Sequence, residues 1–472
     1  MDPNRGVPRR GLVWRFIQAC IVAAAFLFVT DTVAASNAAS GLSDASRESM
    51  RVPQWLYLST GGAVIGASAL LASFVTDRGF IREIHDWQRN RSLPDSVRRS
   101  AVAAVRALGV VGLVVVVYTG VTGPQIPTVS FAILVTFVGV RAGLTMVSYL
   151  VGNVWRVLNP WRTLTEYLPT GYVSYPSRAG RWPAVFGLFV LVWIELVTAI
   201  TTRPAVLASV VVGYSIITIT GAVLFTPDTW FHNADPVSVL FRFYGSVSPV
   251  TRDSTGVSVA LPGSGLVESE PVDGFADVAF VIALIWELTF SGFVTTTAGA
   301  QFVESVVGFG VPPLLVYGSL LLGGYGVFAG AYWLGAKLTR RTIATYVTPQ
   351  SLALRFAPPL LAIAAGYHLA HYAGFFVSMS PSLTAALTTP FSPPANPLVL
   401  TLPDWFGGLD IAFILLGHLL AIFVAHVTAY DLFPSRLQAI RSQYPFVAVM
   451  IGYTVLSLWI VSLPSAMPPY LG

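Results

Sequence analysis

Long apolar stretches recur along nearly the whole chain of 472 residues, and they constrain its fold more than any other feature. Ten of them are long enough to cross a hydrocarbon layer about 30 Å thick as helices. Lipid offers no hydrogen-bond partner to a bare backbone, so such stretches predict α-helices. We therefore expect an all-α, polytopic transmembrane helical bundle with ten spans, at about 55–75, 101–122, 127–150, 183–201, 204–226, 276–300, 311–334, 350–378, 405–432 and 445–464.

The composition excludes a soluble protein of this size. Charged residues make up 10% of the chain, whereas soluble domains carry roughly 25%. No polar block interrupts the series of spans, so residues 55–472 are expected to form one transmembrane domain. The net charge is +5, but the chain has no polar domain that would present a basic surface, so no nucleic-acid binding is expected. Cys20 is the only cysteine, which excludes disulfides and thiolate metal cages.

Residues 1–35 have the pattern of a targeting segment. Basic residues come first, an apolar stretch follows, and small residues end it at Ala35. This order is typical of a secretory signal peptide, and an uncleaved signal anchor has the same pattern. Either interpretation places residues 36–54 outside the cytoplasm.

Arginine sets the expected orientation of the bundle. Loops rich in Lys and Arg face the cytoplasm in membrane proteins. The 76–100 connection alone contains six arginines, and the basic connections after it alternate with poorly charged ones. The loops expected in the cytoplasm are about 76–100, 151–182, 227–275, 335–349 and 433–444, which leaves the C-terminus outside.

Three further motifs have structural interpretations. Asn159 and the proline after it predict a helix end at the inner face, with Trp155 and Trp161 at the membrane interface. The stretch 235–244 predicts an amphipathic segment along that interface. The glycine cluster Gly323–Gly326 predicts close helix packing rather than a phosphate-binding loop.

Histidine is the most informative residue type. Four of the six histidines lie in two consecutive expected spans. His368 and His371 are three residues apart, which places both on one helix face. His418 and His426 lie on the next expected helix, again close to one face. Counting ~1.5 Å per residue from the outer ends puts the first three at a similar depth, with His426 deeper.

Two carboxylates also fall inside apolar spans. Glu287 is expected at the depth of the histidines, and Glu195 nearer the outer end. An ionisable group in hydrocarbon costs several kcal/mol, so its presence indicates a function. Arg141 lies inside a span as well and needs a partner, for which Glu195 and a backbone carbonyl are the alternatives.

Together these residues predict an outward-facing transition-metal site within the membrane. Imidazole nitrogens with a carboxylate suit Zn, Cu, Fe or Ni. A metal-bound water would attack a small apolar ester or phosphotriester that partitions from the membrane lipid. The expected ligands are His368, His371, His418, His426 and Glu195, with Glu287 as a further ligand or a catalytic general base.

Other interpretations remain open at this point. The same residues would serve as a transient site in a transporter or channel-like carrier for a metal ion or a proton. They would be structural if the protein is a non-catalytic membrane subunit whose histidines tie helices together. Haem is the less favoured ligand, because a two-haem bundle usually spaces its histidines further along each helix, at different depths.

Several of these motifs are similar to those of a known family. They are Asn-Pro-Trp-Arg at 159–162, Trp-Ile-Glu-Leu at 193–196, Gly-Tyr-His-Leu-Ala-His-Tyr at 366–372, and the histidines at 418 and 426. From about Val52 to Asp431 the chain resembles the fenitrothion hydrolase-like family of multi-span prokaryotic membrane proteins. The resemblance implies a plasma-membrane location in a prokaryote and a phosphotriester hydrolase activity. Ser291 departs from the family pattern, which has an Asp at that place.

Overall fold

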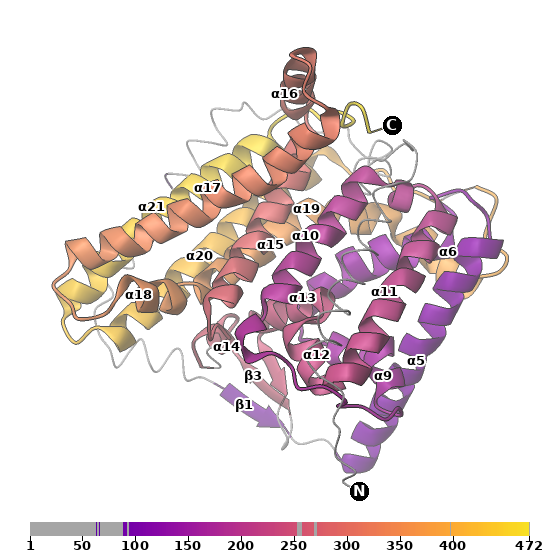
Figure 1. The fold of residues 1–472 in the computed structure, drawn as a ribbon, viewed down its shortest axis with the longest axis horizontal. Coiled ribbons are helices and arrows are strands. Elements are labelled where there is room, and N and C mark those ends of the chain that lie inside the picture. Colours follow the sequence, from indigo (N-terminus) through magenta and orange to yellow (C-terminus); the bar gives the residue numbers. More distant parts are fainter. Residues whose placement is uncertain are drawn as a thin grey trace, which may run out of the picture.

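The computed structural model describes residues 88–91, 94–252, 257–268, 271–396 and 398–471, together with positions 63 and 66. In this part the chain forms a bundle of long helices with one small sheet (Figure 1). The targeting segment 1–35 and, apart from those two positions, the expected first span at 55–75 lie outside the described residues.

Eight helical stretches in the described part are long and apolar enough to cross a membrane. Each occupies one of the expected spans, so a multi-span helical membrane protein is confirmed, while the count of ten spans stays a prediction. A ninth expected span is the shorter apolar helix α10 (Trp182–Val197). The eight are α5 (Asp95–Thr122), the continuous run of α6 (Phe131–Ile133), η1 (Leu134–Leu144) and α7 (Thr145–Leu150), α11 (Pro204–Phe225), α15 (Phe275–Val294), α17 (Pro313–Thr342), α19 (Pro358–Thr388), α20 (Gly407–Leu432) and α21 (Arg436–Val461).

Proline defines the beginning of several of these helices. It occupies the first positions of α11, α17 and α19. The backbone N–H that proline lacks would have no partner within the helix at that position, so the residue costs nothing there and prevents the helix from extending backwards. The turn between α10 and α11 is therefore short and contains only the 3₁₀ turn η3 (Ala199–Thr201) before Pro204.

Helices α15 and α19 form the centre of the bundle (Figure 1). In the apolar window of α15, 94% of the residues are buried, against 11% in that of α5. α19 packs along α20, and their backbones approach closely where Gly366 faces Gly417. A Cβ atom on Gly366 would lie 2.6 Å from the carbonyl oxygen of Phe413. The side chains of Glu287 on α15 and His368 on α19 are consequently buried.

The glycine cluster on α17 packs closely at one position. A Cβ atom on Gly324 would lie 2.1 Å from the indole ring of Trp286 on α15. That indole donates a hydrogen bond of 2.7 Å to the carbonyl of Leu321, which holds the ring against the glycine. Gly323 and Gly326 have no atoms within 4 Å of a Cβ position. The predicted close packing therefore depends on Gly324 alone.

The shorter elements lie mostly at the end of the bundle that carries the expected cytoplasmic loops. They are β1 (Gln88–Arg91), α8 (Trp155–Leu158), α9 (Pro160–Thr165), η2 (Ser177–Ala179), α12 (Pro227–Asn233), α13 (Pro236–Gly245), β2 (Val250–Arg252), β3 (Val257–Ala260), α14 (Ser264–Glu268) and α18 (Pro349–Arg355). The strands form an antiparallel sheet in the order β1-β3-β2. β1 and β3 come from two loops that the arginine pattern places on the same side, and their pairing agrees with that placement.

The opposite end of the bundle carries α16 (Thr297–Gly308), the 3₁₀ turn η4 (Asp404–Phe406) and the C-terminal segment. The backbone N–H of Ala466 bonds to the carbonyl of Thr295 at 2.9 Å, and that of Thr297 bonds to the carbonyl of Pro464 at 3.0 Å. The C-terminal segment thus lies beside the start of α16, at the same end of the bundle (Figure 1).

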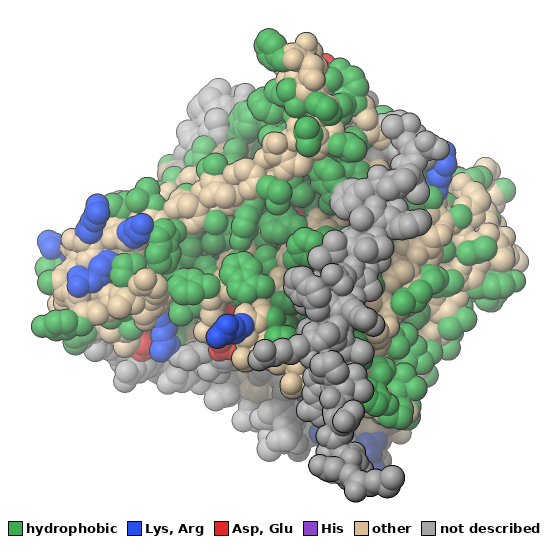
Figure 2. Space-filling view, viewed as in Figure 1, with side chains coloured by type: hydrophobic (Ala, Val, Ile, Leu, Met, Phe, Trp, Pro, Cys, Tyr) green, Lys and Arg blue, Asp and Glu red, His purple; other side chains and the backbone are tan. Residues whose placement is uncertain are grey.

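The surface has the pattern of a membrane protein. Figure 2 shows hydrophobic side chains over the sides of the helices, with Lys and Arg gathered near the tip formed by α17, α18 and α21. Basic residues in these elements and the connections between them are Lys337, Arg340, Arg341, Arg355, Arg436 and Arg441. The assignment of this end to the cytoplasm stays a prediction from the positive-inside rule.

The segments predicted at the inner face pack against the protein, and their position relative to the membrane interface stays a prediction. In α13, which covers most of the stretch 235–244, the side chains of Phe243 and Tyr244 are fully buried against the core. Trp155 and Trp161 are also buried, in a second aromatic cluster with Phe241. Asn159 begins helix α9 by accepting a hydrogen bond from the N–H of Arg162, rather than only ending a helix. These loops therefore fold back into the bundle.

Candidate intramembrane charge cluster

Arg141 is the centre of the most highly charged site within the spans. It lies in η1, which is a π-helix of 11 residues. π-Helical turns are rare and are frequently found at functional sites, because the wider turn displaces side chains from their α-helical positions. Arg141 lies near the middle of its span. The π-helical turn therefore holds a guanidinium at a depth where a charged group costs several kcal/mol.

Three side chains from three other helices bind the Arg141 guanidinium. Nη1 lies 2.8 Å from Oε2 of Glu195 on α10, and Nη2 lies 2.5 Å from Oε1 of Glu287 on α15. Nε donates a hydrogen bond of 2.8 Å to the hydroxyl of Tyr372 on α19. All three nitrogens of the guanidinium therefore have an oxygen partner, which is the arrangement that makes arginine a strong buried cation.

The cluster contains one cation and two acids. Glu195 and Glu287 are both buried, whereas the Arg141 side chain keeps 27% of its surface exposed. If both carboxyls were ionised, the site would carry a net charge of about −1 in the interior of the bundle, and a buried charge without a partner is costly. One bound proton would make the cluster neutral.

His368 is held on both ring nitrogens. Nε2 lies 3.1 Å from the carbonyl oxygen of Arg141, and Nδ1 lies 3.1 Å from the hydroxyl of Tyr149. A carbonyl only accepts hydrogen bonds, so Nε2 carries the proton and Nδ1 accepts from the tyrosine. The ring also stacks on Tyr372 with centroids 4.6 Å apart and contacts Tyr244 from the buried helix α13. His368 thus has no lone pair directed at a metal.

His371 lies beside the cluster, whereas the histidines on α20 have separate surroundings. His371 packs edge-on against Tyr372, with ring centroids 5.0 Å apart. On α20, His418 is buried and its Nδ1 lies 2.7 Å from the carbonyl oxygen of Ile414, one turn earlier. His426 has its Nδ1 3.3 Å from Oε1 of Gln443 on α21.

The predicted ligands therefore do not converge on a common point. Within the described residues, no group of three or more His, Cys, Asp or Glu side chains is arranged to hold a metal ion. The physical reason is that Arg141 binds the two carboxylates, while His368 bonds to a tyrosine and a backbone carbonyl. The metal site and the hydrolase activity stay predictions, and this geometry does not favour them.

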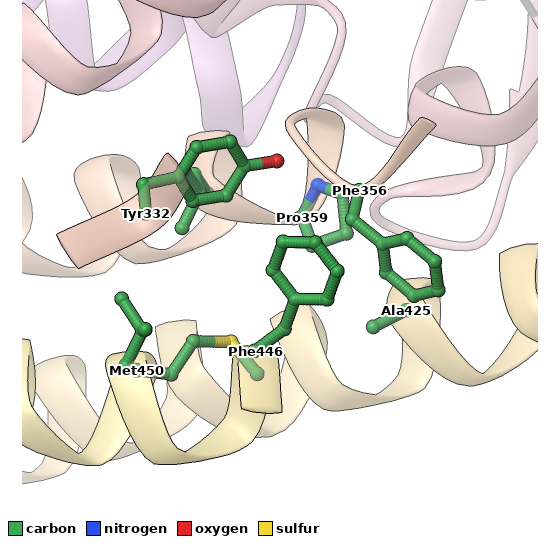
Figure 3. Close-up of a pocket in the computed structure, with 8 residues that line it drawn as sticks. Tyr332, Phe356, Pro359, Ala425, Phe446 and Met450 are labelled. Atoms are coloured by element: carbon green, nitrogen blue, oxygen red, sulfur yellow. The ribbon is translucent and has the colours of Figure 1, made fainter. Parts of the chain in front are cut away.

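A small cavity near the inner ends of α17, α20 and α21 is a packing gap. It has a volume of about 10 Å³, which is room for about one water molecule. Figure 3 shows that its walls are apolar side chains, and Phe356 and Phe446 stack there with centroids 4.6 Å apart. The Tyr332 hydroxyl is already bonded to the carbonyl of Ala353. No polar group is left to orient a ligand.

The sequence indicates the members of the charge cluster but only part of their pairing. Glu195 is one of the two partners that it offers for Arg141, whereas Glu287 is predicted to join the histidines. The sequence does not indicate the roles of Tyr149, Tyr244 and Tyr372. The tyrosines on either side of His368 in the motif at 366–372 are the sequence feature that points to aromatic partners for this histidine. They do not indicate which face of α19 contacts η1.

A second cluster of charges lies at the expected cytoplasmic end. Nε2 of His232 on α12 lies 2.8 Å from Nη2 of Arg181 and 3.2 Å from Nη1 of Arg242. Arg181 also pairs with Asp273 at 3.1 Å and with the buried Asp277. Partial burial and the two arginines lower the pKa of His232, although the two aspartates oppose this shift.

We expect His232 to make the protein less stable in mild acid. Because the pKa of His232 is lowered by folding, the unfolded chain binds a proton first as the pH falls through about 6.5, which favours unfolding. Between about pH 7.5 and pH 5.5 the melting temperature should fall, and His232→Gln should reduce that fall by about 1–3 °C. Gln keeps an acceptor for the arginines. A variant with the same pH profile as the wild type, measured by thermal unfolding in detergent, would contradict the assignment.

Comparisons with known proteins give no relative for this chain: no family model, no curated protein and no solved structure matches it.

Proposed function

We propose that the protein is a membrane carrier that binds and releases a proton at the Arg141 cluster. The observation that carries the proposal is the pairing of one arginine with two glutamates from two different helices, α10 and α15. An excess of one acid within a span supports a bound proton, since ionisable groups inside membranes commonly form proton relays.

The surroundings of the cluster support exchange of that proton. The Arg141 side chain keeps 27% of its surface exposed, so the cluster is not sealed inside the protein. The Tyr372 hydroxyl accepts a hydrogen bond from the guanidinium and is a further polar group beside the two carboxyls. His368 and Tyr149 form a separate chain of hydrogen bonds that begins at the backbone carbonyl of Arg141.

Infrared spectroscopy of the protein in lipid tests the bound proton. We expect a carbonyl band of a protonated carboxyl group at about pH 7 in the wild type, because one of the two acids is neutral. Glu287→Gln and Glu195→Gln should each remove the band, since either change leaves one carboxylate balanced by Arg141. Glu304→Gln on α16, where the side chain is exposed, is the matched control and should keep it. An unchanged band in both cluster variants would refute the proton site.

Proton flux into liposomes tests the carrier role. A potassium diffusion potential should drive protons into vesicles that contain the wild-type protein and a pH-sensitive dye. With Glu287→Gln the rate should drop to that of protein-free vesicles, and with Glu304→Gln it should stay at the wild-type rate. Equal flux in wild type and Glu287→Gln would show that the cluster does not conduct protons.

A further inference from the structure

We propose that a groove between α5 and α9 binds an anionic phospholipid in the leaflet at the β-sheet end of the bundle. The groove has a volume of about 560 Å³. Three of its lining residues are arginines, Arg98, Arg99 and Arg106, and none is acidic. The binding site is distinct from the Arg141 cluster and does not depend on the proton-carrier proposal.

Four of the lining residues on α5 form one stripe along the helix. Arg99, Val102, Arg106 and Val110 follow one another at intervals of three or four residues, so their side chains lie on one face. From Arg99 to Val110 the stripe is about 16 Å long at ~1.5 Å per residue. This length suits a phosphate at the helix end and the first part of an acyl chain below it.

One wall of the groove comes from the segment after α7. Thr163 on α9 and the exposed Tyr167 line the side facing α5. Gly109, next to Val110, allows the backbone at Leu158 to touch α5. A Cβ atom on Gly109 would lie 1.9 Å from the Leu158 carbonyl oxygen, so a larger residue would prevent this approach. The arginines thus lie at one end of the groove, and Val110 lies at the other end, towards the middle of α5.

Charge and location together select the ligand. Arg106 bonds to Glu166 at 2.9 Å, and Glu166 is shared with Arg162 at 3.3 Å, which orients Arg106 at the groove wall. In the described part of the chain, only 11% of the residues in the apolar window of α5 are buried, which leaves most of this apolar helix surface available for contact with lipid. Basic pockets beside transmembrane helices attract anionic headgroups, and the apolar floor below the arginines fits an acyl chain rather than a soluble anion.

Native mass spectrometry of the full chain in detergent tests the proposal, with phosphatidylglycerol and phosphatidylcholine as the probes. The wild type should bind phosphatidylglycerol about tenfold more tightly than phosphatidylcholine. Arg98→Gln/Arg99→Gln should remove this preference by weakening the headgroup site. Ala103→Trp should weaken binding of phosphatidylglycerol by filling the floor while the arginines remain.

A matched variant separates the groove from general charge effects. Arg436→Gln/Arg441→Gln removes two exposed arginines from α21, in the basic tip formed by α17, α18 and α21, and should leave the preference intact. Equal weakening in both double variants would overturn the proposal, as would an unchanged preference in Arg98→Gln/Arg99→Gln. Displacement of the lipid by millimolar glycerol phosphate would overturn the lipid assignment in favour of a site for soluble phosphate esters. Failure of glycerol phosphate to compete supports the acyl-chain floor.

Discussion

Replacing Arg141 with Met is expected to lower the free energy of unfolding by about 3–5 kcal/mol, the usual cost of removing one partner of a buried ion pair. The methionine fills much of the same space but leaves Glu195 and Glu287 without their cation. It also removes the donor to the Tyr372 hydroxyl. The loss is measured as a large drop in the melting temperature of the purified protein in detergent.

A compensating variant separates the lost charge balance from lost packing. Arg141→Met/Glu195→Gln/Glu287→Gln has no net charge in the cluster, so it should recover more than half of the lost stability. Arg203→Met, at an exposed arginine in the turn before α11, is the control and should change stability by less than about 0.5 kcal/mol. If the triple variant were as unstable as Arg141→Met alone, unpaired charge would not be the cause.

Gly366→Val should be the other strongly destabilising change, by about 3 kcal/mol, because added atoms in a closely packed core force the backbone apart. A Cβ atom at this position would lie 2.6 Å from the carbonyl oxygen of Phe413 and 2.8 Å from the Cα of Gly417. Both are backbone atoms and no side-chain rotation can relieve the contact. Helices α19 and α20 would have to separate.

The effect of Gly366→Val should reach the charge cluster as well as stability. His368 and Tyr372 lie on the same helix as Gly366, so moving α19 displaces both from Arg141. Gly452→Val on α21 is the matched control, since nothing lies within 4 Å of its Cβ position. Its cost should stay below about 1 kcal/mol. Similar melting temperatures for the two valine variants would contradict the close contact of α19 with α20.

The described transmembrane helices could be predicted from hydrophobicity because each span must satisfy its own backbone hydrogen bonds in lipid. Helix ends were less accurate: α10 ends at Val197 rather than near 201, and α19 continues to Thr388, past the predicted end at 378. These ends depend on local contacts, such as the bonds from the hydroxyls of Ser378 and Ser382 to the chain at 398–400. Hydrophobicity carries no information about them.

The shared level of Glu287 and His368 was predictable, but the level of Glu195 and the partners of these residues were not. Glu195 was expected nearer the outer end, yet it binds the same guanidinium as Glu287. Counting residues placed Glu287 at the level of His368, and both contact Arg141 in the folded protein, one through the guanidinium and the other through the carbonyl. What depth leaves undetermined is the direction in which each side chain points around its helix axis. His418 was assigned to the same site at the same depth, yet its Nδ1 faces the carbonyl of Ile414 on its own helix.

The sequence by itself determined that the chain crosses a membrane many times, where the described spans lie, and which ionisable residues are inside them. Only the tertiary structure decided that Arg141, rather than a metal, joins the two glutamates, and that α13 folds back to contact His368. The reason is physical: hydrophobic periodicity follows from each helix and the lipid around it, whereas pairing of buried charges follows from how helices distant in sequence rotate and pack against one another.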